Sequence, residues 1–345
     1  MPNLSSFYRG KRVLVTGHTS FFGGWLTAWL KLMGGNVIGF ALPPRSRPNL
    51  FDVTILDRNI ISIFGDVRDR DALTAAFVHQ QPEIVIHLAG QAAAKYAQTA
   101  PVETCSTNVM GTVHVLEEAR YARSLRAVLV VTIEERAEKD PSEDDLYAST
   151  MACARTVTAA YREKFFHQPG SAAIGCAQVV SAIGGGDWEE GGVVPAVAHA
   201  ISAGETVSIN NADCLHTWQH VLDPIRGCLL AAQLLYERGT GNESSWRFAA
   251  TGVPVSVQEI ATRMVSLWHE DVLVTPESSW GPPTRSQSGS RHTEDPAEFA
   301  WHAALDLDQT LAWTVEWYRS FYQNAALAWP ITEAQIRRFA QLAEE

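Results

Sequence analysis

The chain has 345 residues, of which 46% are hydrophobic and 19% are charged, and its 27 basic and 38 acidic side chains give a formal net charge of −11 at pH 7. A chain of this length and apolar content buries a full core and usually divides into two lobes, which excludes a disordered protein. The acidic balance, without a stripe of Lys and Arg, disfavours nucleic acid as a partner. Only five of the basic residues are lysines, at positions 11, 31, 95, 139 and 164.

The sequence also indicates where the protein works. Its longest apolar runs are of strand length and fall far short of the roughly 20 residues that a membrane helix needs. The first 11 residues are mostly polar and contain no apolar signal segment. The 5 cysteines are widely spaced and include no CxxC pair, which disfavours a disulfide framework or a cysteine zinc site. We therefore expect a cytoplasmic protein with no membrane partner and no metal.

The first half of the chain alternates predicted strands and helices. Residues 12–16 are a β-branched run that leads into a glycine-containing turn and then a helix with apolar residues at helical spacing. Further strand-like runs span residues 37–42, 60–64, 83–88, 126–131 and 171–180. Apolar strands separated by segments long enough for crossover helices predict an α/β protein with a Rossmann-type, doubly wound parallel sheet.

After about Gly184 the pattern changes to shorter strands, glycine-rich loops and a terminal amphipathic helix over 307–322. We expect residues 1–180 to form an NAD(P)-binding domain and residues 181–345 to form a smaller, mixed substrate-binding lobe. Some elements of this lobe are expected to thread back to the first domain.

The turn after the first predicted strand has the features of an anion site. A strand that ends in a glycine turn and leads into a helix presents unpaired backbone N–H groups and the helix dipole to a ligand. Gly17-x-x-Ser20-x-x-Gly23 has this placement and the spacing of a dinucleotide loop, with serine at the middle position. Ser20 adds a side chain where backbone and pyrophosphate approach closely. A purely structural turn is the alternative.

Other strand ends contribute to the same predicted site. Asp66 and Val67 are placed to hold an adenine edge, although Asp66 would also suit the N-cap of the next helix. No acidic residue follows the second strand to bind the ribose hydroxyls, whereas Arg45 and Arg47 would suit a 2′-phosphate. The cofactor is therefore NAD or NADP.

Several segments carry a resemblance to a known family: residues 10–19, 21–26, 82–87, 101–104, 107–113, 183–188 and 218–221. They resemble the extended short-chain dehydrogenase/reductase family of NAD-dependent epimerases and dehydratases, and within it the CDP-glucose 4,6-dehydratase branch. The resemblance implies lyase or isomerase activity on a nucleotide sugar. It also implies a homodimer built from two long helices, here within 104–122 and 148–166. The implied cofactor-binding residues are Gly17, Thr19, Ser20, Phe21, Phe22, Gly23, Asp66, Val67, Leu88, Ala89, Gly90, Thr107 and Tyr147.

The catalytic motif of that family is altered here. In the family, a Tyr-x-x-x-Lys pair oxidises the sugar C4 hydroxyl, acid and base residues remove the C5 proton and expel the C6 hydroxyl, and hydride returns to C6. In this chain the pair reads Tyr147-Ala-Ser-Thr-Met151, so the ammonium group that lowers the tyrosine pKa is missing. A tyrosine with the ordinary pKa of about 10 is a poor base at pH 7. An ordinary, partly buried Tyr147 is the alternative.

The acid/base positions have changed as well. Thr132, Glu134 and Glu135 stand at the positions where the branch carries its acid and base residues. The implied catalytic set is therefore Thr132, Glu134, Glu135, Tyr147 and Met151. Two adjacent carboxylates can serve as acid and base if their environments separate their pKa values. Alternatively, the two glutamates belong to a solvated acidic loop.

The resemblance also implies a set of substrate contacts, and these have changed in one direction. Three positions that hold arginine in the family are here Gln178, Asn210 and His216. Arginines are the main ligands of a diphosphate, so their loss argues against tight binding of an ordinary CDP-sugar. The implied substrate-binding residues are Gln91, Lys95, Ser181, Asn210, His216 and Trp218.

Three interpretations remain open. The first is a sugar-nucleotide dehydratase or epimerase that works without the lysine. The second is an enzyme redirected to non-redox acid/base chemistry on another sugar or natural product, and the third is a non-catalytic NAD(P)-binding homologue. We expect an NAD(P)-binding protein of the dehydratase/epimerase type.

Overall fold

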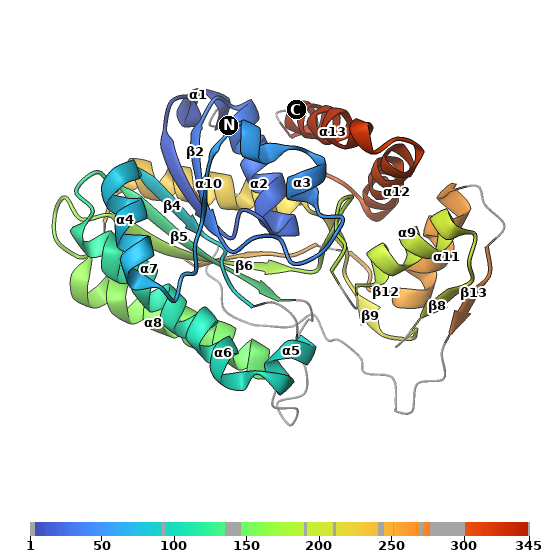
Figure 1. Cartoon of the computed structure of the whole chain (residues 1–345), viewed down its shortest axis with the longest axis horizontal. Helices are drawn as coiled ribbons and strands as arrows, with labels where there is room; N and C mark the ends of the chain where they lie inside the picture. The colour runs from blue at the N-terminus through green and yellow to red at the C-terminus, as the bar shows by residue number, and fades with distance from the viewer. Residues whose placement is uncertain are drawn as a thin grey trace.

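A seven-stranded parallel sheet forms the centre of the molecule (Figure 1), with the strand order β3-β2-β1-β4-β5-β6-β11. The computed structural model describes residues 4–91, 94–134, 146–189, 192–209, 212–240, 245–250, 252–268, 272–276 and 301–343. The strands of the sheet are β1 (Arg12–Thr16), β2 (Asn36–Ala41), β3 (Ile61–Phe64), β4 (Ile84–His87), β5 (Ala127–Glu134), β6 (Ala173–Val180) and β11 (Ser245–Phe248). The predicted Rossmann-type parallel sheet is confirmed.

Helices cover both faces of this sheet because its strands are apolar on both sides. In β1, Val13 and Val15 belong to one hydrophobic cluster, whereas Leu14 between them belongs to another. The first cluster includes side chains of α2 (Phe21–Leu32), α10 (Leu222–Arg238) and α13 (Ala328–Leu342). The second includes side chains of α4 (Arg70–Gln80) and α7 (Gly111–Tyr121), with α8 (Leu146–Phe165) packed against it.

The connection between β4 and α7 is a series of short helical segments. It consists of α5 (Ala94–Thr99), α6 (Pro101–Cys105) and a π-helical turn, η2 (Ser106–Met110). π-Helical turns inside longer helices are frequent at functional sites because they redirect a side chain. Asn108 lies in this turn and is 2% exposed, so its amide is directed into the protein.

The second half of the chain builds a smaller lobe and also returns to the main sheet. The lobe contains β8 (Val207–Ile209) paired with β13 (Val274–Pro276), β9 (Leu215–His216) paired with β12 (Val255–Ser256), α9 (Val193–Ala203) and α11 (Val257–Trp268). α10 and β11 extend the sheet and its cover, while α12 (Leu307–Gln323) packs on α11. The predicted terminal helix is thus α12, but α13 follows it and packs on α2. Figure 1 shows α13 near α2, and α12 between α13 and the smaller lobe.

Close packing requires a glycine in the segment 183–188. A Cβ at Gly185 would lie 2.1 Å from Cγ of Trp317 in α12, and the Gly185 carbonyl accepts a hydrogen bond from Nε1 of Trp25 at 2.9 Å. The Tyr318 hydroxyl accepts from the Asp187 amide at 3.1 Å and donates to its carbonyl at 2.5 Å. Only glycine leaves room for this tryptophan, so this segment fastens α12 to α2.

The segment 218–221, in the second half of the chain, is fastened to the main sheet. Nε2 of Gln219 donates to the carbonyls of Val180 in β6 and Phe248 in β11, at 2.5 and 2.9 Å. The next residue, His220, is fully buried, and burial lowers its pKa to about 3. It is therefore a neutral core histidine. Within the described ranges, no helix has the length and apolar composition to cross a bilayer.

Candidate functional site

The glycine turn between β1 and α2 is as tight as its spacing predicts. Gly17 has a φ of +78°, and a Cβ there would lie 2.9 Å from the backbone nitrogen of Ala89. A Cβ at Gly23 would lie 2.1 Å from the Gly17 carbonyl oxygen. Both positions therefore require glycine. The turn brings the start of α2 next to the loop after β4, as a dinucleotide loop does.

Ser20 is the N-cap of α2. Its Oγ accepts a hydrogen bond from the Gly23 amide at 3.1 Å and donates to the Gly17 carbonyl at 2.9 Å. The hydroxyl is thus directed into the turn. Of its neighbours, Thr19 donates to the Leu42 carbonyl at 2.9 Å and the Phe22 side chain is buried in the core. The first N–H groups of α2 remain the part of this turn suited to an anion.

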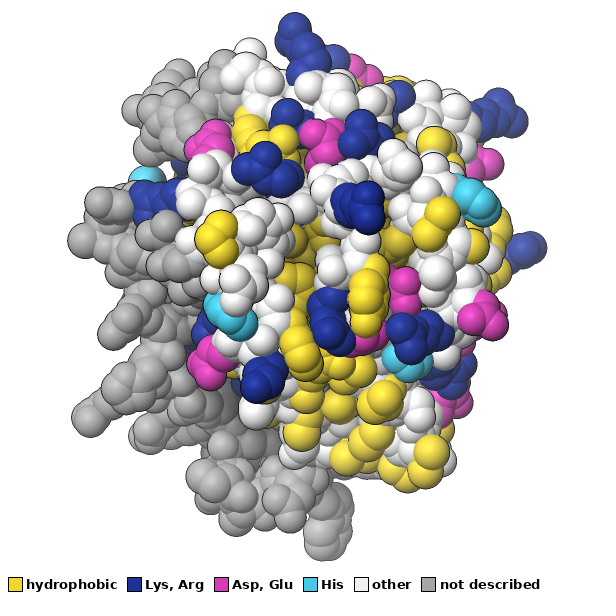
Figure 2. All heavy atoms as spheres, turned by 90° about the vertical axis from the view of Figure 1, so that its left-hand side faces the viewer, with side chains coloured by type: hydrophobic (Ala, Val, Ile, Leu, Met, Phe, Trp, Pro, Cys, Tyr) yellow, Lys and Arg dark blue, Asp and Glu magenta, His cyan; other side chains and the backbone are white. Residues whose placement is uncertain are grey.

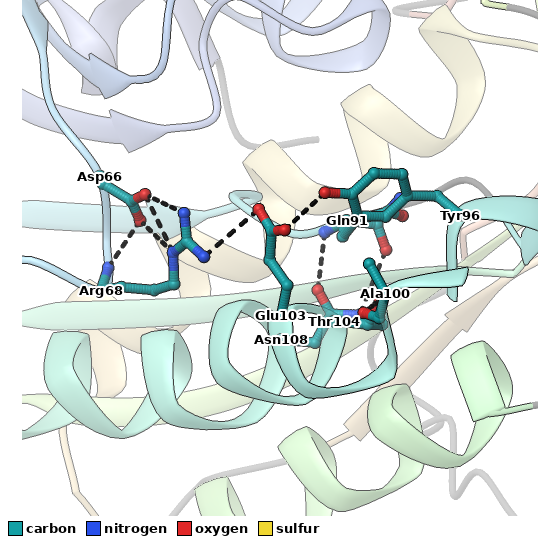
Figure 3. A network of polar contacts seen from close by, with 8 residues as sticks. All are labelled: Asp66, Arg68, Gln91, Tyr96, Ala100, Glu103, Thr104 and Asn108. Carbon is teal, nitrogen blue, oxygen red and sulfur yellow. Dashed lines mark hydrogen bonds and ion pairs between the residues drawn. The ribbon is translucent and has the colours of Figure 1, made fainter. Parts of the chain in front are cut away.

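The loop after β3 places Asp66 in a charged network (Figure 3). Both carboxylate oxygens accept hydrogen bonds from the Arg68 guanidinium at 2.6–3.0 Å, which hold the pKa of Asp66 below its ordinary value. Arg68 also pairs with Glu103 at 3.3 Å, and Glu103 accepts from the Tyr96 hydroxyl at 2.5 Å. Asp69, not Asp66, caps α4, so the capping alternative for Asp66 is wrong.

A buried polar chain supports the loop after β4. The Thr16 hydroxyl accepts from the amides of Leu88 and Ala89, each at 3.1 Å, and lies 2.7 Å from Nδ1 of His87. Nε2 of His87 lies 3.2 Å from the Thr112 hydroxyl. Burial lowers the pKa of His87 to about 4, so the ring is neutral at pH 7. The residues predicted to lie beneath the cofactor ribose are thereby fixed to β1.

A small cavity of about 40 Å³ opens at the carboxyl ends of β4 and β5. Its lining brings together the loop after β4, the π-helical turn, the end of β5 and the start of α8. Ligands of doubly wound folds bind at this edge of the sheet. The lining residues used below are Leu88, Ala89, Gly90, Gln91, Asn108, Thr132, Tyr147 and Met151.

Asn108 fixes one wall of this cavity. Its Oδ1 accepts from the Gln91 amide at 2.6 Å, and its Nδ2 donates to the Gln91 carbonyl at 3.2 Å and to the Thr150 hydroxyl at 2.9 Å. The Gln91 side chain is 1% exposed, yet its Oε1 and Nε2 have no hydrogen-bond partner among the residues that the structure describes. A buried amide without partners costs free energy unless a ligand or water satisfies it. The site therefore offers a donor and an acceptor.

Tyr147 and Met151 form the opposite wall. They pack with Ala97 in a small buried cluster, at 5% and 7% exposure. The Tyr147 hydroxyl donates to the Ile133 carbonyl at the end of β5. Met151 approaches the loop after β4, where its Cε lies 3.7 Å from the position of a Cβ on Gly90. The methionine thus places an apolar group where the family resemblance implies an ammonium group.

Thr132, the other predicted catalytic residue in the lining, is 2% exposed. Nη1 of Arg155 in α8 lies 3.4 Å from its Oγ1. Glu134 is the last residue of β5 and pairs with Val180 of β6, whereas Glu135 lies outside the described residues. The structure therefore brings Thr132, Tyr147 and Met151 to one cavity.

The predicted substrate residues are more scattered. Gln91 lines the cavity, whereas Ser181, His216 and Trp218 lie outside its lining. Ser181 has a φ of +45° between β6 and β7 (Ala182–Ile183), and the His216 and Trp218 rings meet edge to face at 5.4 Å. Lys95 lies in α5, and Asn210 is outside the described residues. Thr107 lies in the π-helical turn beside Asn108.

Sequence reasoning overlooked three of the polar residues at the site. Asn108 directly follows the predicted Thr107, within the segment 107–113 that carries the family resemblance, and this position is a signal that could have identified it. Thr16 and His87 end their strands at the edge where ligands bind. Among the described residues, no group of three or more His, Cys, Asp or Glu side chains could hold a metal ion.

Two curated proteins illustrate what the chain resembles in sequence. CDP-glucose 4,6-dehydratase of Salmonella typhimurium is 33% identical over 344 residues, which cover 92% of this chain and 93% of the relative. UDP-glucuronate 4-epimerase 1 of Arabidopsis thaliana is 25% identical over 353 residues, which cover 91% of this chain and 78% of the relative.

Solved structures share the fold. UDP-glucose 4-epimerase of Thermotoga maritima, solved with UDP-glucose, aligns with a TM-score of 0.72 at 19% identity over 89% of this chain and 98% of that one. dTDP-glucose 4,6-dehydratase of Bacillus anthracis, in complex with NAD, aligns with a TM-score of 0.70 at 18% identity over 93% of this chain and 100% of that one. The model of the NAD dependent epimerase/dehydratase family matches residues 13–243, so the chain belongs to this family.

Proposed function

We propose that this protein is an NAD(P)-dependent dehydratase or epimerase that acts on a nucleotide sugar. In this proposal residues 1–180 bind the cofactor and residues 181–345 contribute to the substrate site. The observation that carries it is the cavity at the carboxyl ends of β4 and β5, which Thr132, Tyr147 and Gln91 line together with Ala89, the residue that Gly17 of the glycine turn approaches. A cytoplasmic location is part of the same proposal, in line with the wide spacing of the five cysteines in the sequence.

The residues present fit a dinucleotide. The glycine turn is closed to any side chain at Gly17 and Gly23, and the helix N-terminus beside it suits a pyrophosphate. Within the described part of the chain the buried Gln91 amide lacks hydrogen-bond partners, as expected of a side chain that meets a ligand. When bound, the nicotinamide supplies a hydride acceptor. Thr132 and Tyr147 would hold the sugar hydroxyl that loses its proton, and the small cavity would exclude water.

A second candidate function is supported by Met151. Its side chain is 7% exposed in an apolar cluster with Tyr147, so the cluster itself contains no cation to stabilise a tyrosinate. A site of this kind would suit acid/base chemistry without hydride transfer, or binding without catalysis. Turnover distinguishes these functions from the first, because only the first breaks a C–H bond at the sugar C4.

We also infer a homodimer. The side of the molecule with α4, α7 and α8 carries exposed apolar residues, among them Val78, Tyr121 and Phe165, at 61%, 67% and 38% exposure. Figure 2 shows hydrophobic side chains gathered on this side between basic and acidic ones. Light scattering should give twice the chain mass, and Tyr121→Glu should shift the protein to monomer; a monomeric wild type would contradict the inference.

The proposed function is tested with purified protein, NAD or NADP, and CDP-glucose as the first substrate, followed by UDP- and dTDP-glucose. Calorimetry should show dinucleotide binding that is lost in Gly23→Val, a change that puts side-chain atoms against the Gly17 carbonyl. Gly24→Val is the matched control at the next position of α2, because a Cβ there would lie 2.9 Å from the Leu50 side chain and not against the turn. Absence of dinucleotide binding would contradict the proposal.

A further inference from the structure

Met151 and Arg155 lie one helical turn apart on α8, both on the side of the helix that meets the end of β5. Residues four positions apart lie on the same face of a helix. Met151 lines the cavity beside Tyr147. Nη1 of Arg155 lies 3.4 Å from Oγ1 of Thr132, which lines the same cavity. The helix thus brings a guanidinium to the site from which the expected ammonium group is missing.

We propose that Arg155 is a positioning residue, which supplies through Thr132 the positive charge that Met151 does not. This inference rests on the proposed function, because it assigns Arg155 a role in the same site. Arginine stays protonated at any working pH. Arg155 therefore polarises its neighbour without exchanging a proton, unlike the lysine of the family motif.

The direction of the hydrogen bond follows from the groups involved. A guanidinium has N–H donors and no acceptor, so the Thr132 oxygen accepts and the hydroxyl proton is left to point elsewhere. The Thr132 side chain lines the cavity, and that proton is available to an oxygen bound there. The contact of 3.4 Å is long, as acid/base contacts often are before a substrate binds.

The chemical consequence is a stronger donor in the cavity. A hydroxyl that accepts from a cation is polarised and donates a stronger hydrogen bond of its own. At 2% exposure Thr132 is shielded from water, where such effects are larger. Negative charge that develops on a sugar oxygen during the reaction would be stabilised by Thr132 directly and by Arg155 through it.

Arg162 provides a matched control on the same helix. Both arginines are half-buried, and both act against the burial that raises the pKa of Cys176 to about 11. Arg162 lies seven residues beyond Arg155, in the last turn of α8, away from the end that carries Tyr147. Replacing either arginine by methionine removes one charge from α8, but only the change at Arg155 removes the contact to Thr132.

The test compares Arg155→Met, Arg155→Lys and Arg162→Met in steady-state turnover of the nucleotide sugar. Because a lost charge-stabilising contact acts in the transition state, we expect Arg155→Met to lower kcat at least roughly tenfold and to leave KM within about threefold. Arg155→Lys should recover part of kcat, and Arg162→Met should stay within about twofold of wild type. Equal kcat in the two methionine variants, or an effect on KM alone, would overturn the proposal.

A second measurement does not depend on activity. In the cofactor-free protein, the denaturant midpoints of Thr132→Val, Arg155→Met and the double variant form a double-mutant cycle. We expect the double variant to lose less than the sum of the single losses, because each single change removes the same contact. Additive losses would overturn the role of Arg155. If the wild type turns over no nucleotide sugar, the proposed function fails, while the cycle still decides whether Arg155 holds Thr132.

Discussion

The Thr16 hydroxyl donates a hydrogen bond to Nδ1 of His87 at 2.7 Å, and this contact fixes the protonation of the ring. The Thr16 oxygen already accepts two amide N–H groups, so its own proton goes to Nδ1. Nε2 therefore carries the ring proton and donates it to Thr112, whose hydroxyl in turn donates to the Asn108 carbonyl at 2.7 Å. One chain of hydrogen bonds thus joins β1, β4 and the π-helical turn beneath the cavity.

The first prediction concerns this chain of hydrogen bonds, which begins at Thr16. Thr16→Val keeps the shape of the side chain but leaves the Ala89 amide and Nδ1 of His87 without this partner, whereas the Leu88 amide keeps the Thr16 carbonyl at 3.1 Å. We expect a loss of about 1–3 kcal/mol in the free energy of unfolding, measured by urea titration. Dinucleotide affinity should fall as well, because the loop after β4 loses its attachment. Thr16→Ser retains the hydroxyl and should stay near wild type; equal losses in both variants would contradict this role.

The second prediction concerns Gly39 in β2, where a Cβ would lie 2.3 Å from the ring of His18. The His18 ring is fully buried and bonds to Ser62 Oγ at 2.8 Å, so it has little room to move. Gly39→Ala should therefore destabilise the protein by about 1–3 kcal/mol through overpacking. Adding His18→Ala should recover part of that loss in thermal unfolding. A double variant with fully additive losses would show that the two residues do not clash.

The third prediction concerns Met151→Lys, the change that recreates the family motif. The side chain is 7% exposed in an apolar cluster, so an uncompensated buried ammonium group should cost about 3–5 kcal/mol in unfolding free energy, whereas Met151→Leu should cost less than about 1.5 kcal/mol. If Arg155 already supplies the charge, kcat should not rise. A hundredfold gain in kcat would instead show a site disabled by the methionine, and would argue against the role of Arg155.

The fourth prediction concerns pH and Asp223 in α10. Its Oδ1 accepts from the Ala304 amide at 2.5 Å, and burial raises its pKa to about 7. Because the folded-state pKa is raised, its stabilising contribution is complete below about pH 4 and is lost as pH rises to about 7. Urea unfolding should show wild type losing stability relative to Asp223→Asn between these pH values. Parallel pH profiles for the two proteins would contradict the raised pKa.

The sequence predicted the sheet well for a physical reason. Strands such as β1 and β4 are buried on both faces, so their residues are apolar throughout and stand out against the helices between them. β11 was not predicted, since its four residues include the polar Ser245 and Arg247. α13 was also missed. Its apolar face is buried only through tertiary contacts, for example Phe339 against Trp29 at 5.5 Å between ring centroids.

The candidate site was predicted in part. Glycine positions could be identified because no other residue fits the turn, and Tyr147 and Thr132 could be identified from the order of motifs. Arg155 could not, because the family motif directs attention to the position four residues after Tyr147, whereas the arginine reaches the site from eight residues after it. Its contact with Thr132 depends on how α8 packs on β5, which the local sequence does not encode.

We propose that NAD(P)-dependent chemistry on a nucleotide sugar takes place in the cavity that Gln91, Thr132 and Tyr147 line. Its most direct test is mass spectrometry after chromatography of CDP-, UDP- and dTDP-glucose incubated with NAD or NADP and an equal concentration of protein. For at least one sugar we expect a product lighter by one water or an epimer of unchanged mass, and we expect this product to be absent with Thr132→Val. Sugars that all remain unchanged, or a product formed equally by Thr132→Val, would contradict it.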